Sequence, residues 1–163
     1  MRTQKQRRRQ HKTDYLKRLK LLKSGKPRIV FRRTNKNIIA QYVQSKEAKD
    51  KIVFGVNSKN LLKYGWPENA KGSLKSITAS YLTGYLIGKQ IKDKKLEQPI
   101  IDFGMLRMIQ KGKQYAFIKG VIDSGIDIKC SEKAFPIEER IKGEHMKNKI
   151  PFDEIKKKIG EGK

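Results

Sequence analysis

The chain has 163 residues, with 40 Lys and Arg against 16 Asp and Glu, which gives a formal net charge of +24. A chain of this length predicts a single domain, and so large an excess of one charge repels itself in the compact state unless a polyanion neutralises it. Nucleic acid is the favoured polyanion, because no apolar run approaches the ~20 residues of a membrane span and the basic N-terminal segment lacks the apolar core of a secretory signal.

Residues 1–27 form a strongly basic arm that holds eleven Lys and Arg and a single acid, Asp14. The first twelve residues contain no aliphatic side chain after Met1, so they cannot build a core. We therefore expect them to be disordered when the protein is free.

A helix is predicted in the second half of this arm, with Thr13 as its N-cap and Asp14 in its first turn. Its apolar side chains recur at helical spacing: Tyr15, Leu16, Leu19 and Leu22. Segment 24–27, which contains Gly25 and Pro27, ends the helix. The helix thus offers one apolar face for docking and one basic face for an acidic partner.

Three strands are predicted next, because segments 28–34, 38–44 and 52–56 are rich in β-branched and aromatic residues. Segment 34–37 reads Thr-Asn-Lys-Asn, which is typical of a turn, since Asn tolerates left-handed backbone conformations. The first two strands are therefore predicted to pair as a hairpin, and the third is predicted to extend it into a meander.

Two helices follow the strands in the prediction. The first is short, covers residues 59–64, and is capped by Ser58 and closed by Gly65. The second runs from Ser73 to about residue 94. Its apolar stripe consists of Leu74, Ile77, Tyr81, Leu82, Tyr85, Leu86 and Ile91. Gly84 and Gly88 lie one turn apart on this helix, which predicts that it packs closely onto the sheet.

The remaining third of the chain alternates between the two kinds of element. A buried strand is predicted at residues 100–103, a helix at 114–124 that ends at Gly125, a further short strand at 126–128 and a last helix at 136–146. The lysine-rich tail, residues 147–163, is expected to be partly mobile.

The main elements, read in chain order as βββαβα, predict an α/β fold in which helices cover a mixed β-sheet, because later crossovers need helices to place strands parallel. The chain divides on this reading into three parts. Residues 1–27 are a basic RNA-binding arm and helix, residues 28–146 are the α/β body, and residues 147–163 are the lysine-rich tail.

Residues that could support catalysis or hold a metal are few. The two histidines, His11 and His145, have no second His or Cys at the spacing of metal ligands. No phosphate-binding glycine motif is present, so we expect no cofactor. The single cysteine, Cys130, cannot form an internal disulfide, and we expect a small buried residue in a reducing cytoplasm.

Two other functions are compatible with parts of the pattern. Three antiparallel strands followed by αβα resemble the ribonuclease H architecture, in which carboxylates converge on two metal ions. Asp102, Asp123 and Asp127 are the candidate ligands, but the first strand carries no carboxylate, and Asp102 before Gly104 is more simply a strand-end residue that bonds local backbone. A basic membrane-surface protein is the second alternative, because the helix after Asp14 is basic and amphipathic.

Several strings occur together in the order and spacing of one known family. They are KTDYLKRLKLLKSGKPRIVFRRTNKNIIAQ at 12–41, NSKNLLKYGW at 57–66, ASYLTGYLIGK at 79–89, IDFGMLR at 101–107, FIKGVIDSG at 117–125 and FPIEERIKGEH at 135–145. With these strings the chain closely resembles ribosomal protein eighteen of the large subunit, in its archaeal and eukaryotic branch. The resemblance covers about residues 2–146.

The resemblance implies a structural protein of the ribosome without catalytic activity. It implies an α/β sandwich that binds 5S ribosomal RNA (5S rRNA) and anchors it to the central protuberance, near the large ribosomal RNA and beside large-subunit ribosomal protein five and other proteins there. The eukaryotic relatives carry a long C-terminal extension that this chain lacks, which points to an archaeal-type ribosome.

The resemblance implies two groups of RNA-binding residues, and we add His11 to the first group because it lies in the basic arm. The first group lies in the basic arm and its helix: Arg2, Lys5, Arg7, Arg8, Arg9, His11, Lys12, Tyr15 and Arg18. The second group lies at the hairpin between the first two strands: Arg32, Arg33, Asn35 and Lys36. Arginine suits both places, because its planar guanidinium pairs with phosphates and stacks on bases.

Overall fold

The computed structural model describes residues 3–47, 49–146 and 149–162. Its elements follow the predicted βββαβα order, with further helices before and after it. They are α1 (Gln6–Arg9), α2 (Tyr15–Lys23), β1 (Arg28–Arg33), β2 (Ile38–Lys46), β3 (Lys49–Asn57), the 3-10 helices η1 (Ser58–Tyr64) and η2 (Glu68–Ser73), α3 (Ile77–Asp93), β4 (Ile100–Asp102), α4 (Lys113–Asp123), η3 (Glu132–Ala134), α5 (Glu138–Lys142) and α6 (Phe152–Gly160).

The four strands form one mixed sheet in the order β3-β2-β1-β4. β1 pairs antiparallel with β2, β2 pairs antiparallel with β3, and β1 pairs parallel with β4, with Val30 opposite Asp102. The parallel pair needs a crossover, and α3 supplies it. The α/β fold with a mixed sheet, the hairpin and the meander are thus confirmed.

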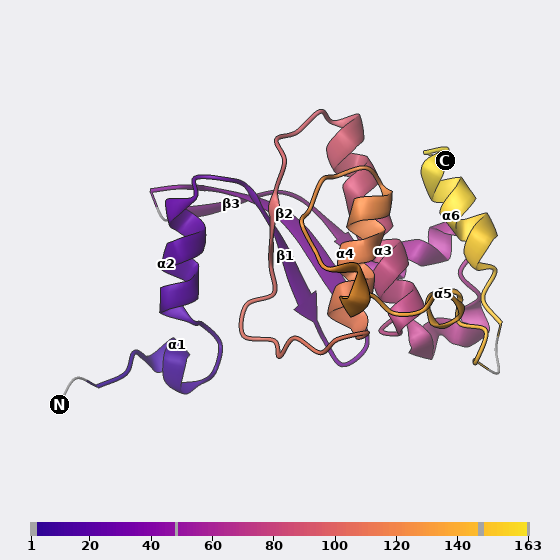
Figure 1. The fold of residues 1–163 in the computed structure, drawn as a ribbon, viewed down its shortest axis with the longest axis horizontal. Helices are drawn as coiled ribbons and strands as arrows, with labels where there is room; N and C mark the ends of the chain where they lie inside the picture. Colours follow the sequence, from indigo (N-terminus) through magenta and orange to yellow (C-terminus); the bar gives the residue numbers. More distant parts are fainter. Residues whose placement is uncertain (1–2, 48, 147–148, 163) are drawn as a thin grey trace.

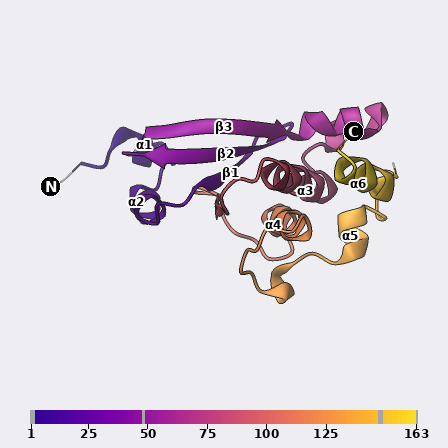
Figure 2. The ribbon, with the colours of Figure 1, turned by 90° about the horizontal axis from the view of Figure 1, so that it is seen from above.

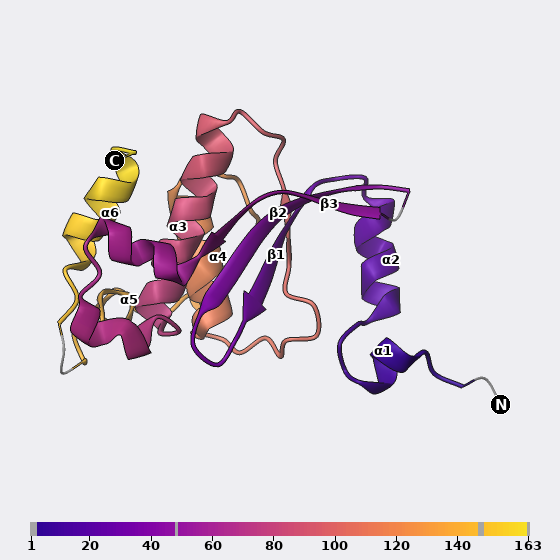
Figure 3. The same ribbon diagram turned by 180° about the vertical axis from the view of Figure 1, so that it is seen from behind.

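α3 and α4 lie on one side of the sheet, and α1 and α2 lie on the opposite side (Figures 1 and 3). Alternate residues of β1 therefore meet different neighbours. Ile29 and Phe31 are fully buried, and the Phe31 ring lies 4.9 Å from the ring of Phe117 on α4 and 5.3 Å from that of Phe103. The core thus sits between the sheet and the α3–α4 layer.

α3 and α4 approach each other closely through glycine. A Cβ atom at Gly84 would lie 2.3 Å from the backbone oxygen of Phe117, and one at Gly88 would lie 2.8 Å from the Cβ of Ser124. Gly120 on α4 likewise has no room for a side chain against the Tyr81 backbone. The close packing predicted for Gly84 and Gly88 is present, but these two glycines approach α4, whereas α3 contacts the sheet through other residues.

Three predicted helix starts differ from the structure. Asp14, and not Thr13, caps α2, because its carboxylate accepts bonds from the backbone N–H groups of Leu16 and Lys17. Asn57, and not Ser58, caps η1. α3 begins at Ile77 behind Ser76, and the segment from Ser73 that was expected to be helical belongs to the end of η2 and a turn.

The C-terminal part departs most from prediction. The segment 126–128 is not a strand, and the helix expected at 136–146 is cut to α5 because Gly143 takes a left-handed conformation, with φ 79°. Part of the tail that was expected to be mobile is instead α6, which buries Phe152, Ile155 and Ile159 in the core. Figure 2 shows α6 and α5 beside the α3–α4 layer, at the opposite end of the molecule from the arm.

The arm also has structure that was not expected. Within the first twelve residues, which were predicted to be disordered, Gln6–Arg9 form one helical turn without any buried residue. Cys130, which was expected to be buried, is half-buried at the edge of the core. Among the described residues, no helix is long and apolar enough to cross a membrane.

Candidate nucleic-acid interface

Helix α2 contacts the body through Lys17 and Arg18 and turns Leu16 and Leu19 outward. The Lys17 ammonium donates to the backbone oxygen of Gly104 at 3.0 Å, and Arg18 donates to Asp50 at 2.9 Å. Leu16 is 65% exposed and Leu19 is 50% exposed. The prediction that the apolar face would dock was therefore wrong for these two residues.

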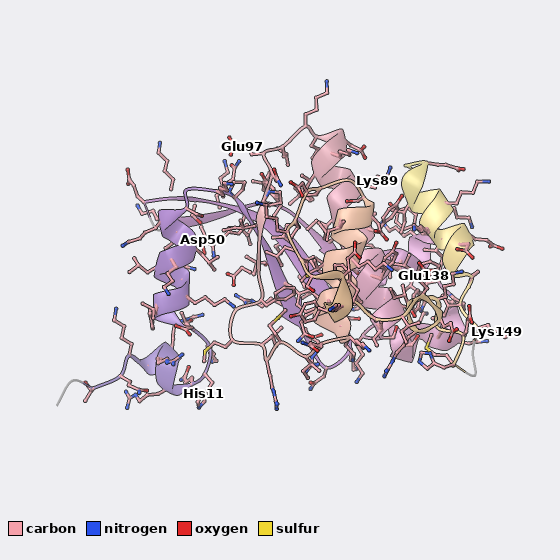
Figure 4. All side chains as sticks on the ribbon, viewed as in Figure 1. His11, Asp50, Lys89, Glu97, Glu138 and Lys149 are labelled. Atoms are coloured by element: carbon pink, nitrogen blue, oxygen red, sulfur yellow. The ribbon has the colours of Figure 1, made fainter. Side chains whose placement is uncertain are left out.

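Asp50 ties the arm to the sheet. One carboxylate oxygen accepts from Arg18, and the other accepts from Arg28 on β1 at 2.7 Å and from the Ser45 hydroxyl at 2.7 Å. Burial alone raises the pKa of Asp50, but the hydrogen bonds from Arg18 and Ser45 and the positive charge of Arg28 and Arg18 hold that pKa below its ordinary value. Figure 4 places Asp50 beside α2.

Arg28 is the buried centre of this network, with 2% of its side chain exposed. It pairs with Asp50 on β3 and, at 3.1 Å, with Asp102 at the end of β4. Asp102 also accepts from the backbone N–H of Gly104 at 2.7 Å, as the sequence predicted for a strand-end residue. Two carboxylates around one guanidinium compensate a charge that would be very costly to bury alone.

Arg32 extends the basic cluster on the same side of the sheet. Its guanidinium crosses Gly104 so closely that a Cβ there would lie 2.7 Å from Nη1. It helps to line a small cavity of about 70 Å³ between the arm and the sheet. We call the basic side chains around this cavity the arm surface: Arg7, Lys12, Lys17, Arg18 and Arg32.

The other predicted arm residues lie outside this cavity. The Lys5 ammonium sits 4.7 Å from the centre of the Tyr15 ring, and the Arg8 guanidinium lies 3.6 Å from Asp14. Arg9 and His11 are exposed, and Figure 4 shows His11 at the outer end of the arm, near α1. Arg2 lies outside the described residues.

Arg33 belongs to a different surface from its neighbour Arg32, because successive strand residues point to opposite faces. It lies near Lys113, at the start of α4, and Lys75, just before α3, is the second positive neighbour of Lys113. Burial, followed by these two positive neighbours, lowers the pKa of Lys113. The predicted turn residues Asn35 and Lys36 lie on this side, in a turn closed by the Thr34 hydroxyl, which donates to the backbone oxygen of Asn37.

We call this second cluster the turn surface; its basic members are Arg33, Lys36, Lys59, Lys71, Lys75 and Lys113. The structure thus divides the predicted hairpin residues between two surfaces. Sequence reasoning also missed Lys17, Lys59, Lys71, Lys75 and Lys113. Lys17 did have a signal, because it lies on the basic face of the predicted arm helix. The other four lysines have none apart from the overall lysine content, because they converge only when η1, η2 and α4 meet the β1–β2 turn.

The carboxylates nominated for a nuclease do not converge. Asp102 is held by Arg28, whereas Asp123 accepts a hydrogen bond from the Tyr81 hydroxyl on α3. Burial and this carboxylate raise the pKa of Tyr81. Within residues 3–47, 49–146 and 149–162, no three His, Cys, Asp or Glu side chains gather so that they could hold a metal ion.

Comparison with known proteins finds similarity to ribosomal proteins of the large subunit. The model of the family described as ribosomal large subunit proteins 60S L5 and 50S L18 matches residues 1–99. The large ribosomal subunit protein uL18 of Korarchaeum cryptofilum is 46% identical over 140 residues, which cover 86% of this chain and 70% of the relative. The protein of the same name from Methanothermobacter thermautotrophicus is 38% identical over 140 residues, or 86% and 71% of the two chains.

Proposed function

The chain belongs to the family of ribosomal large subunit proteins 60S L5 and 50S L18, and we propose that within the subunit it binds 5S rRNA and anchors it to the central protuberance. Membership makes the chain a cytoplasmic structural protein of the large subunit and not an enzyme. It thereby removes both the nuclease and the membrane-surface alternatives. The proposal that the chain binds 5S rRNA in particular goes beyond family membership and rests on the structure of the arm.

The arm surface is the observation that carries this proposal. Three arginines and two lysines, contributed by α1 and the segment after it, α2 and β1, line one small cavity. Asp14 and Asp102 also line it, but Asp102 is already held by Arg28, so the surface keeps a net positive charge. Arginines in this number favour paired contacts to RNA phosphates and stacking on bases.

The ion-pair network gives this surface a fixed shape. Arg18 and Lys17 hold α2 against Asp50 and Gly104, and Asp50 is shared with the buried Arg28. A cluster of cations on a rigid support can favour one RNA shape, whereas cations on a flexible chain neutralise any phosphate. Discrimination of 5S rRNA from other RNAs is therefore assigned to the arm surface.

The remaining partners follow from the family resemblance. Anchoring requires contact with the large ribosomal RNA as well as with 5S rRNA. Large-subunit ribosomal protein five and other proteins of the central protuberance are the proposed protein neighbours. The exposed Leu16 and Leu19 provide apolar area on α2 that such a neighbour could cover.

A competition gel shift tests the proposal. The full chain is bound to labelled 5S rRNA and challenged with excess transfer RNA, and we expect the complex to survive. The double variant Lys12→Ala/Arg32→Ala, which removes two cations of the arm surface, should lose this preference. The matched variant Lys129→Ala/Lys133→Ala removes two exposed cations outside both basic surfaces and should keep it. Displacement of wild-type protein by transfer RNA would contradict the assignment to 5S rRNA.

A further inference from the structure

The turn surface borders an open groove of about 750 Å³, a volume typical of pockets for small molecules. The β1–β2 turn, whose path Figure 3 shows, lines this groove together with the segment just before α3. Three elements line it: the turn itself with Asn35, Lys36 and Asn37, then η1 with Lys59 and Leu62, and finally the segment from Lys71 to Lys75.

The lining combines an apolar wall with a polar rim. Leu74 is buried at the edge of the core, Leu62 is half-buried, and both residues line the groove. The side-chain amides of Asn35 and Asn37 stand nearby, and each can both donate and accept hydrogen bonds. An aliphatic wall next to amides suits a flat, partly apolar group with hydrogen-bonding edges, which describes a nucleobase.

The rim is positively charged and lacks internal compensation. Among the described residues, Arg33, Lys36, Lys59, Lys75 and Lys113 make no ion pair with an acid.

The exception on this surface is Lys71, which pairs with Glu68 at 2.8 Å. Lys75 lines the groove and also lies near Lys113. The pKa of Lys113 is lowered by burial and by the positive charges of Arg33 and Lys75. Cations gathered without acids are stabilised when a polyanion binds.

We propose that this groove binds a single-stranded segment of ribosomal RNA, with a base against Leu62 and Leu74 and the adjoining phosphates at Lys59, Lys75 and Arg33. The proposal rests on the proposed function for the source of the RNA. It adds a second RNA site on the face of the sheet away from the arm surface, because Arg32 and Arg33 point in opposite directions. One protein can then hold two separate RNA segments.

Single-stranded RNA fits the groove better than duplex RNA does. A-form duplex presents phosphates and sugars, and its bases are stacked inside, so the apolar wall would have nothing to contact. An unstacked base can enter the groove while its flanking phosphates stay at the rim. An acidic peptide would match the charge but would leave both the wall and the amides unused.

The test compares two RNAs on the full chain. A fluorescein-labelled oligouridylate of about eight nucleotides and a mixed-sequence RNA duplex of the same length are titrated by anisotropy. Leu62→Ala should lower the ratio of single-stranded to duplex affinity by about fivefold, which corresponds to the loss of about 40 Å² of apolar contact with a base. Lys59→Ala/Lys75→Ala should lower the same ratio, because the duplex does not use this groove. The matched variant Lys129→Ala/Lys133→Ala should leave the ratio unchanged. Lys59 and Lys75 are exposed, so the result for Lys59→Ala/Lys75→Ala does not depend on core packing.

A second readout places the RNA on the protein. Oligouridylate that carries 4-thiouridine should cross-link to residues 57–75 on irradiation. Cross-links confined to residues 3–23 would overturn the proposal. An equal decrease in the ratio of single-stranded to duplex affinity in Lys59→Ala/Lys75→Ala and in Lys129→Ala/Lys133→Ala would also overturn it. Displacement of oligouridylate by polyglutamate, with the same dependence on Leu62, would overturn it in favour of an acidic peptide.

Failure of this proposal is distinguishable from failure of the proposed function. If wild-type protein keeps its preference for 5S rRNA over transfer RNA but shows no effect of Leu62→Ala or Lys59→Ala/Lys75→Ala on the ratio, the groove proposal alone fails. If the preference for 5S rRNA is absent while the groove variants behave as expected, the 5S assignment alone fails.

Discussion

Replacing Asp50 by asparagine should weaken the body of the protein and loosen the arm at once. The aspartate uses both oxygens, one for Arg18 and one for Arg28 and Ser45. Asparagine has the same size but only one oxygen, and its NH2 group donates hydrogen bonds and cannot accept one from a guanidinium. One of the two arginines therefore loses its partner in Asp50→Asn.

The structure sets the size of the effect. Removal of one partner of a fully buried ion pair costs about 3–5 kcal/mol. Arg28 is fully buried but keeps Asp102, and the Asp50 side chain is 33% exposed. The expected loss is therefore closer to that of a hydrogen bond to a charged group, about 1.5–3 kcal/mol. Because asparagine is also neutral, the arginine that keeps the remaining oxygen loses the charge of its partner, and for the more exposed Arg18 this costs less than about 1 kcal/mol.

Urea unfolding at two pH values measures the loss. Because the pKa of Asp50 is lower in the folded protein, its stabilisation is present above the ordinary aspartate pKa of about 3.9 and is lost as the pH falls below that value. Wild type and Asp50→Asn should differ at about pH 7, and the difference should shrink as the pH falls below the ordinary aspartate pKa of about 3.9. Asp127→Asn, which removes an exposed carboxylate, serves as the matched control. A difference of less than about 0.5 kcal/mol at neutral pH, the size of an ordinary surface change, would refute the network reasoning.

Three further outcomes are expected. Ile155→Ala on α6 should destabilise the protein by about 2–5 kcal/mol in urea unfolding, because this side chain is fully buried, and a loss below about 1 kcal/mol would show that the core does not need the tail helix. Lys113→Met should raise the unfolding free energy by up to about 0.5 kcal/mol, because burial and positive neighbours lower the pKa of Lys113. This gain should fade as the pH rises above about 10, where the lysine loses its charge in both states, and a pH-independent gain would contradict this electrostatic cause. Deletion of residues 1–12 removes Arg7 and Lys12 of the arm surface, so it should weaken binding to 5S rRNA more than binding to transfer RNA. It should also lower the log–log salt slope by about one unit for each lost phosphate contact, and an unchanged slope would argue against phosphate neutralisation by the arm.

The sheet was predictable because its signals are local. Alternating β-branched residues in segments 28–34 and 38–44, with Thr34 at the turn, are enough to define a hairpin without knowledge of the rest of the chain. The same period of two would also have separated Arg32 from Arg33, had it been applied to the basic residues as well as to the apolar ones.

Other features depend on contacts that no local pattern encodes. Thr13 and Asp14 are both good N-caps, and only the path of the chain decides between them. Arg28 is buried because Asp50 and Asp102 reach it from two other strands. Helix α6 did have a signal, since Phe152, Ile155 and Ile159 recur at helical spacing, but the many lysines around them suggested a solvated tail.

Mapping RNA–protein cross-links on intact large ribosomal subunits tests the central claim most directly. After short ultraviolet irradiation, peptides of this chain are identified together with the RNA to which they are joined. The account predicts that peptides carrying Lys12, Arg18 and Arg32 of the arm surface cross-link to 5S rRNA. Cross-links from these peptides to the large ribosomal RNA alone, with none to 5S rRNA, would contradict it.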